Sequence, residues 1–96
     1  MLMLITYDVN TETAAGRKRL RQVAKACQDY GQRVQNSVFE CVVDAGQMLK
    51  IKARLIGLIN PATDSLRFYT IGKEYKHKVE HYGAKPSFGV EDPLIL

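Results

Sequence analysis

MLMLITYDV, residues 1–9, is the stretch of sequence that decides the fold. Its apolar run is nearly continuous, which is typical of a central strand covered on at least one face. Asp8 stands at the C-terminal end of this strand and is the only carboxylate in the first eleven positions. Because side chains alternate along a strand, Asp8 should share a face with Thr6, and Tyr7 should point the other way.

Two helices are predicted from the spacing of apolar residues. Residues 12–29 show one buried helical stripe, formed by Leu20, Val23, Ala24 and Cys27. We expect residues 10–11 to cap this helix and Gly31 to end it in a left-handed conformation. Residues 44–47, DAGQ, form a capping box that starts a second helix, and the Asn-Pro pair at 60–61 ends it.

The remaining segments with regular patterns are strands. Residues 32–43 are rich in β-branched and aromatic types, and the polar group at 35–37 indicates either a bend or a tight hairpin. Apolar and polar side chains alternate along residues 66–71. The order is therefore βαββαβ, an α+β, ferredoxin-like fold in which two helices cover one face of an antiparallel sheet.

The chain is expected to divide into a core domain, residues 1–73, and a C-terminal linker with an edge strand, residues 74–96. The linker is polar and contains glycine, whereas the last seven residues, VEDPLIL, include an apolar run. A terminal apolar run after a loose linker indicates a strand that pairs with a sheet edge, and a two-fold axis would allow this pairing between copies. We therefore expect a homodimer.

Positive charge is concentrated in the first helix. The chain has 14 Lys and Arg against 10 Asp and Glu, a net charge of +4. Five of these cations follow one another without an acid before Gln28: Arg17, Lys18, Arg19, Arg21 and Lys25. This density favours a phosphate-binding surface over an ordinary solvated helix face, and Arg33, just after the glycine turn, suits phosphate oxygens as well.

Asp8 has two possible interpretations, a helix cap or turn former, and half of a metal site. Mg²⁺ (or Mn²⁺) is commonly held by one or two carboxylates together with waters and phosphate oxygens. Two copies of Asp8 across a dimer axis could share one ion, which would polarise a phosphodiester.

Other classes of site lack their signatures. Cys27 and Cys41 lie within apolar patterns, which predicts buried thiols in a reducing cytoplasm. No apolar run is long enough to span a bilayer, so we expect a cytoplasmic protein without membrane contact. Residues 77–81, HKVEH, match a zinc-peptidase order, but they lack the long helix and third ligand that this mechanism needs. A solvated or phosphate-contacting segment is the favoured interpretation.

Three motifs together resemble the CRISPR-associated protein 2 family: ITYDV at 5–9, the arginine-rich first helix, and GQRVQNSVFEC at 31–41. The resemblance implies a ferredoxin-like homodimer in which Asp8 of each chain faces a divalent metal at the interface. It also implies metal-dependent cleavage of DNA or RNA and assembly with a larger integrase subunit that inserts DNA fragments. By position, Tyr7 and Asp8 match the strand-end pair, with Arg33 and Phe39 following, while Arg17 and Arg19 match less firmly.

These observations predict a Mg²⁺-dependent endonuclease that acts on double-stranded DNA in CRISPR adaptation, an antiviral defence. In it Asp8 is the catalytic and metal-binding residue, the first helix and Arg33 hold phosphates, and Tyr7 and Phe39 support them. Two alternatives remain open: a non-catalytic nucleic-acid-binding dimer that scaffolds the integrase complex, and an endoribonuclease of single-stranded RNA.

Overall fold

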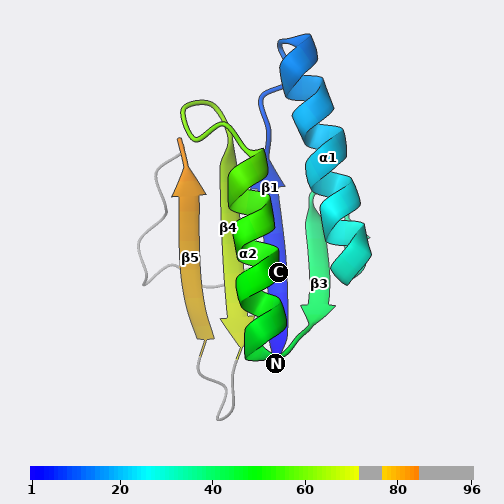
Figure 1. Cartoon of the computed structure of the whole chain (residues 1–96), viewed down its shortest axis with the longest axis vertical. Coiled ribbons are helices and arrows are strands. Elements are labelled where there is room, and N and C mark those ends of the chain that lie inside the picture. Colours follow the sequence, from blue (N-terminus) through cyan, green and yellow to red (C-terminus); the bar gives the residue numbers. More distant parts are fainter. Residues whose placement is uncertain (72–76, 85–96) are drawn as a thin grey trace.

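The computed structural model describes residues 1–71 and 77–84. They form one five-stranded sheet with helices α1 and α2 on one face (Figure 1), and we call the other face, which no described helix covers, the open face. The elements are β1 (Leu2–Asp8), α1 (Ala14–Tyr30), β2 (Gln32–Gln35), β3 (Val38–Val42), α2 (Ala45–Leu58), β4 (Ser65–Ile71) and β5 (His77–Gly83). The sheet order is β2-β3-β1-β4-β5, and every neighbouring pair is antiparallel. The first stretch of the sequence is therefore the central strand, and the predicted ferredoxin-like fold is confirmed.

The core lies between the sheet and the two helices. Alternation along β1 sends Met3, Ile5 and Tyr7 into it, all at most 6% exposed. The predicted stripe of α1 supplies Val23 and Cys27, both fully buried, so hydrophobic spacing identified the inward face of this helix correctly. The other face of β1 carries the alternate residues, which end with Asp8.

The first helix begins later than expected. Its N-cap is Thr13, whose hydroxyl accepts a hydrogen bond from the Gly16 backbone N–H (3.0 Å). Asn10 instead closes a short turn, because its side-chain oxygen accepts from the Glu12 backbone N–H at 2.9 Å. The sequence offered several capping residues in a row, and local propensity alone did not select among them.

Gly31 ends α1 for a different reason from the predicted one. Its backbone is extended (φ −156°, ψ −165°), not left-handed. A Cβ at this position would collide with the Cys41 sulfur and with the Glu40 carbonyl oxygen of β3. The residue is therefore required by the close approach of two strands, and the predicted left-handed cap is wrong.

The second helix and the hairpin follow the sequence closely. Asp44 accepts from the Gln47 backbone N–H (2.7 Å), and the Gln47 side chain accepts from the Asp44 backbone N–H (3.0 Å), which is the predicted capping box. The sequence left a bend or a tight hairpin open at residues 35–37. The structure has a tight hairpin between β2 and β3, with Asn36 and Ser37 at the turn.

β5 is the element that the sequence analysis did not predict. It lies within residues 74–96, which were expected to be a linker and edge strand, and it pairs with β4 along its whole length. Glu80 forms an ion pair with Lys52 of α2, so β5 is also attached to the helical layer. The predicted edge strand at 90–96 lies outside the described residues.

Candidate active site and nucleic-acid interface

Asp8 lies at the exposed end of the central strand. It pairs with Ser65 of β4, and its side chain is on the face of the sheet that has no helices. Tyr7 points the opposite way and is only 6% exposed, so the predicted orientation of both side chains is confirmed. A carboxylate in this position has its backbone fixed by the sheet while its side chain meets solvent.

Three of the predicted site residues form a cluster on the helical side of the sheet. The Tyr7 and Phe39 rings are stacked with centroids 6.2 Å apart, and the Arg33 guanidinium lies 5.1 Å from the Phe39 centroid. The Tyr7 hydroxyl donates to the Asn36 carbonyl oxygen at 3.3 Å. Burial raises the pKa of Tyr7 and outweighs the opposing effect of Arg33. The hydroxyl is thus protonated at neutral pH.

Arg33 and Asp8 lie on opposite faces of the sheet. Arg33 is paired with Phe39, whose ring is in the core, whereas Asp8 faces away from the core. The sequence placed both residues in one site, and the structure separates them within a single chain. The Phe39 ring fixes Arg33 from one side by a cation–π contact.

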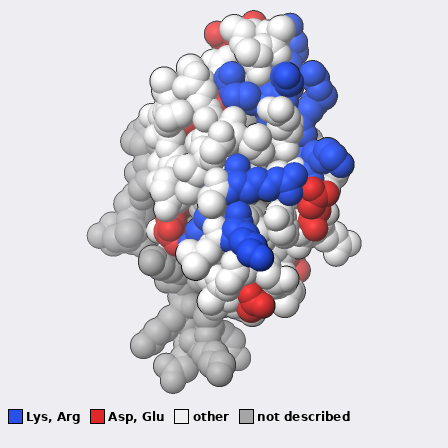
Figure 2. All heavy atoms as spheres, in the orientation of Figure 1, with Lys and Arg blue, Asp and Glu red and all other residues white. Residues whose placement is uncertain are grey.

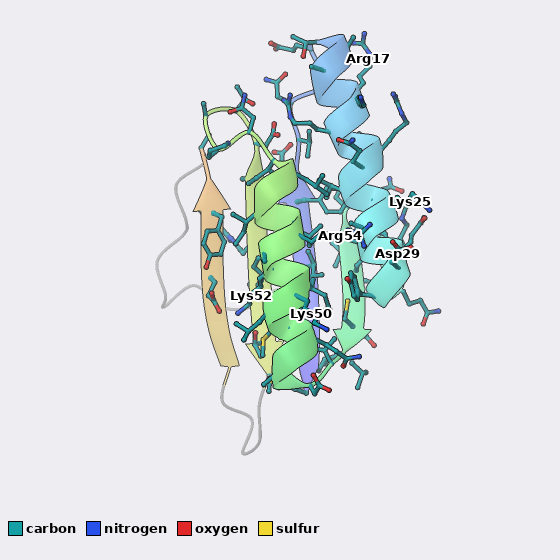
Figure 3. The ribbon with its side chains drawn as sticks, in the orientation of Figure 1. Arg17, Lys25, Asp29, Lys50, Lys52 and Arg54 are labelled. Atoms are coloured by element: carbon teal, nitrogen blue, oxygen red, sulfur yellow. The ribbon has the colours of Figure 1, made fainter. Side chains whose placement is uncertain are left out.

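The predicted cations of α1 divide into two groups. Arg17, Lys18, Arg21 and Lys25 are exposed and form the surface that we call the α1 basic face. Figure 2 shows Lys and Arg gathered over α1 and continuing onto α2, where Lys50 and Arg54 lie (Figure 3). The alternate cations at 50, 52 and 54 are the sequence signal for this extension, which was not predicted.

Some of these cations also have protein partners. Arg54 forms an ion pair with Asp29 of α1 at 3.1 Å, which links the two helices (Figure 3). Arg17 donates from Nη1 to the Thr11 carbonyl oxygen at 3.2 Å. Both contacts are exposed, so they hold the side chains loosely and leave their charge at the surface.

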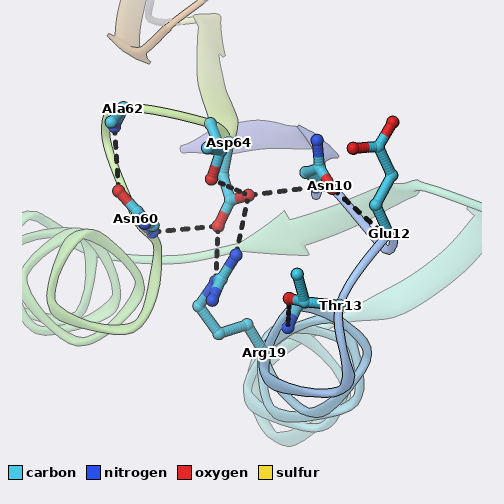
Figure 4. A network of polar contacts seen from close by, with 9 residues as sticks. Asn10, Glu12, Thr13, Arg19, Asn60, Ala62 and Asp64 are labelled. Carbon is cyan, nitrogen blue, oxygen red and sulfur yellow. Dashed lines mark hydrogen bonds and ion pairs between the residues drawn. The ribbon is translucent and has the colours of Figure 1, made fainter.

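Arg19 has a different environment from its neighbours. Its Nε donates to Oδ2 of Asp64 at 2.8 Å, and its side chain is 20% exposed while that of Asp64 is 0% exposed. Asp64 also accepts from the backbone N–H groups of Asn10 and Asn60 and from the Thr63 hydroxyl (Figure 4). Burial would raise the pKa of Asp64, but Arg19 and these hydrogen bonds lower it below its usual value. The sequence analysis missed Asp64, because its partners come together only in the tertiary structure.

The two cysteines are buried and unreactive. Burial, and then the neighbouring Cys41, raise the pKa of Cys27 to about 12. Burial raises the pKa of Cys41 as well. At neutral pH both side chains are therefore thiols, as the sequence predicted, and neither is a nucleophile.

No group of three or more His, Cys, Asp or Glu side chains within residues 1–71 and 77–84 is placed to hold a metal ion. The HKVEH segment forms part of β5, where Glu80 and His81 are neighbours and so point to opposite faces of the sheet. Asp8 therefore belongs to no cluster of three or more such side chains in the described part of one chain. In the same part of the chain, neither helix is long and apolar enough to cross a bilayer.

Comparison with known proteins gives the family. The model of the family described as CRISPR associated protein Cas2 matches residues 1–79. A CRISPR-associated endonuclease Cas2 of Halalkalibacterium halodurans is 64% identical over the whole of both chains. A CRISPR-associated endoribonuclease Cas2 of Nitratidesulfovibrio vulgaris is 58% identical over 100% of this chain and 94% of its own.

Solved structures agree with this assignment. The crystal structure of Streptococcus pyogenes Cas2 at pH 6.5 has a TM-score of 0.69 and 64% sequence identity, and it covers 78% of this chain and 90% of its own. A hypothetical protein from Thermus thermophilus, TT1823, has a TM-score of 0.64 at 31% identity, with 74% of this chain and 80% of its own covered. The central strand with Asp8, the hairpin with Arg33 and Phe39, and these similarities lead to one conclusion: the chain belongs to the CRISPR-associated Cas2 family.

Proposed function

We propose that this protein is a Mg²⁺-dependent endonuclease that acts on double-stranded DNA in CRISPR adaptation, where spacers are acquired and integrated. The observation that carries the proposal is the position of Asp8. Its carboxylate is exposed at the end of the central strand, on the open face of the sheet, in a chain whose relatives are named endonucleases and endoribonucleases. An integrase subunit is the expected protein partner.

Asp8 fits a Mg²⁺ site only when two copies of the chain meet. Mg²⁺ takes oxygen ligands and keeps several waters, so one or two carboxylates suffice. Asp8 offers one exposed carboxylate at the end of β1, and a two-fold axis near that end would supply the second from another copy. Mn²⁺ has the same preference for oxygen ligands and could replace Mg²⁺. The chemistry that the bound ion supplies is polarisation of the phosphodiester and a lowered pKa of a water molecule.

The open face of the sheet supports dimer formation. It carries exposed apolar side chains, among them Val42 (78% exposed) on β3 and Val79 (37% exposed) on β5. Soluble domains rarely leave an apolar sheet face uncovered, and small domains gain stability by association. Two copies that pack through this face about a two-fold axis near the end of β1 would place both Asp8 carboxylates close to that axis.

The cations then hold the substrate. The α1 basic face lies on the helical side and presents four exposed charges to phosphate oxygens. Arg33 is held in place by the Phe39 ring, so its donors are partly oriented before a phosphate arrives. Tyr7 keeps the Phe39 ring in position by stacking and leaves its hydroxyl on the hairpin carbonyl of Asn36.

The test is a cleavage assay with duplex DNA and single-stranded RNA side by side, each with and without Mg²⁺. We expect Mg²⁺-dependent cleavage of the duplex by the wild type and none by Asp8→Asn, which keeps the shape but removes the charge. Cleavage of RNA alone would assign the protein to the endoribonucleases. Residual cleavage by highly purified Asp8→Asn protein would overturn the metal site.

A second candidate function is a non-catalytic scaffold that binds nucleic acid. It is favoured by the separation of the two surfaces, because the α1 basic face and Asp8 lie on opposite sides of the sheet. Duplex binding through the helices would then need no carboxylate. In that case wild type and Asp8→Asn would bind duplex DNA equally, and neither would cleave it.

A further inference from the structure

Asp64 lies directly beside the strand end that carries Asp8. It precedes Ser65, the residue of β4 that pairs with Asp8. Its carboxylate accepts from the backbone N–H of Asn10, two residues after Asp8, at 3.0 Å. The backbone carbonyl of Asp64 accepts from the Ala84 N–H at 2.9 Å, so the same residue also holds the end of β5. The loop that follows Asp8 is thus attached to a fully buried carboxylate.

Asn10 is held on its other sides as well. Its side-chain oxygen accepts from the Glu12 backbone N–H at 2.9 Å. Its carbonyl oxygen lies so close to Gly16 that a Cβ there would collide with it. These contacts leave the loop between β1 and α1 little freedom, and they start two residues beyond the candidate metal ligand.

The Asp64 carboxylate connects three parts of the chain. It accepts from Arg19 of α1 (Nε 2.8 Å, Nη2 3.4 Å), from the Asn10 N–H of the first loop, and from the Asn60 N–H (2.9 Å) and Thr63 hydroxyl (3.1 Å) of the loop before β4 (Figure 4). A buried ion pair contributes little net stability on average, because both charges lose water. What this arrangement determines is geometry, since both carboxylate oxygens accept from donors at fixed places.

We infer that Arg19 and Asp64 are positioning residues for Asp8: they fix the β1–α1 loop so that the Asp8 carboxylate is oriented for its metal ion. Arg19 acts through Asp64 and does not belong to the phosphate-binding surface, although it lies in the same basic run of the sequence. This inference rests on the proposed metal site. Residues that orient metal ligands without touching the metal are commonly important for affinity. Their loss typically lowers metal affinity about 10–100-fold.

The experiment compares Arg19→Gln with Lys18→Gln, its exposed neighbour on α1, which loses the same charge. Three quantities are measured on the full chain: Mn²⁺ affinity by the EPR signal of the free ion, hydrogen exchange of the Asn10 amide by NMR, and the salt dependence of duplex DNA binding. For Arg19→Gln we expect a Mn²⁺ affinity about tenfold lower, faster exchange at Asn10, and an unchanged salt slope. For Lys18→Gln we expect normal Mn²⁺ affinity and exchange, and a salt slope reduced by about one.

Arg19→Lys is the conservative variant, and it should recover part of the Mn²⁺ affinity because a charged donor remains near Asp64. It also keeps the inference testable if Arg19→Gln does not fold. The inference is overturned if Arg19 variants bind Mn²⁺ as the wild type does, or if their only effect is a smaller salt slope. If the wild type itself binds no Mn²⁺, the proposed metal site fails, and the positioning role fails with it.

Discussion

Gly31 stands where α1 passes into β2, and its importance comes from the space around it. Its backbone is extended, but an added Cβ would collide with Cys41 and with the Glu40 carbonyl of β3. A methyl group here must therefore push two well-packed elements apart.

We expect Gly31→Ala to lower the free energy of unfolding by about 1–3 kcal/mol, the usual cost of overpacking a core. Gly57→Ala is the matched control, because nothing lies within 4 Å of a Cβ at this exposed helical position. The control should be neutral or stabilising by up to about 1 kcal/mol, since alanine favours the helix. Urea denaturation measures both, and an equal effect of the two changes would contradict the packing argument.

Asp64 should make the free energy of unfolding depend on pH. Its pKa is lowered in the folded state, because Arg19 and the hydrogen bonds outweigh the effect of burial. A carboxyl group with a lowered folded pKa stabilises the fold above its unfolded pKa, about 3.9 for Asp. This contribution is lost as the pH falls through the folded value.

The Asp64→Asn variant should therefore be less stable than the wild type at pH 7, and the difference should shrink below about pH 4. Urea denaturation between pH 7 and pH 3 measures the two free energies of unfolding. Other carboxylates affect both proteins alike, so the difference isolates Asp64. A difference that stays constant over this range would show that Asp64 does not carry the effect.

At the scale of elements, α1 has two faces of different composition. Its inward face carries the apolar stripe with Val23 and Cys27, and its outward face carries Arg17, Arg21 and Lys25 at four-residue spacing. Arg19 falls outside this outward face and contacts Asp64. The helical period therefore separates Arg19 from the row formed by Arg17, Arg21 and Lys25.

We expect Arg21→Ala to weaken duplex binding and to reduce the slope of log K against log salt by about one, because one phosphate contact is lost. Gln22→Ala is the control, since it removes an exposed uncharged side chain from the same helix and should leave the slope unchanged. Fluorescence anisotropy at several salt concentrations gives the slope. Equal slopes for wild type and Arg21→Ala would remove the α1 basic face from the interface.

The elements that were predicted correctly are those with a clear period or a local capping signal. The central strand, the apolar stripe of α1 and the capping box at Asp44 needed only neighbouring residues. β5 was missed because HKVEHYG lacks an apolar run, and it is stabilised by pairing with β4 and by the Lys52–Glu80 ion pair. The position of Asp8 at the end of β1 was also predicted correctly, since a strand end is a local feature, and its role as a metal ligand stays a prediction. It missed Asp64, because the partners of that carboxylate are up to 54 residues away along the chain.

At the scale of the whole molecule, helices α1 and α2 cover one face of the sheet, and no helix among residues 1–71 and 77–84 covers the other. The helical face encloses the core, and the open face carries Asp8 together with apolar side chains. Val38 lies on this open face and pairs with Thr6 of β1, the residue two positions before Asp8 on the same face. The proposed shared metal site requires that this region meets its own copy.

We therefore expect Val38→Glu to shift the protein from dimer to monomer, because two copies would bring two buried carboxylates together at the interface. Leu49→Glu is the matched control: Leu49 is 69% exposed on α2, in the helical layer, so its replacement should leave the dimer intact. Sedimentation velocity over a range of concentrations measures both. Because one chain has only half of the proposed site, the Val38→Glu monomer should also lose Mn²⁺ binding, although its Asp8 is unchanged. A Val38→Glu protein that remains dimeric would show that the copies meet elsewhere, and a monomer that binds Mn²⁺ normally would show that one carboxylate suffices.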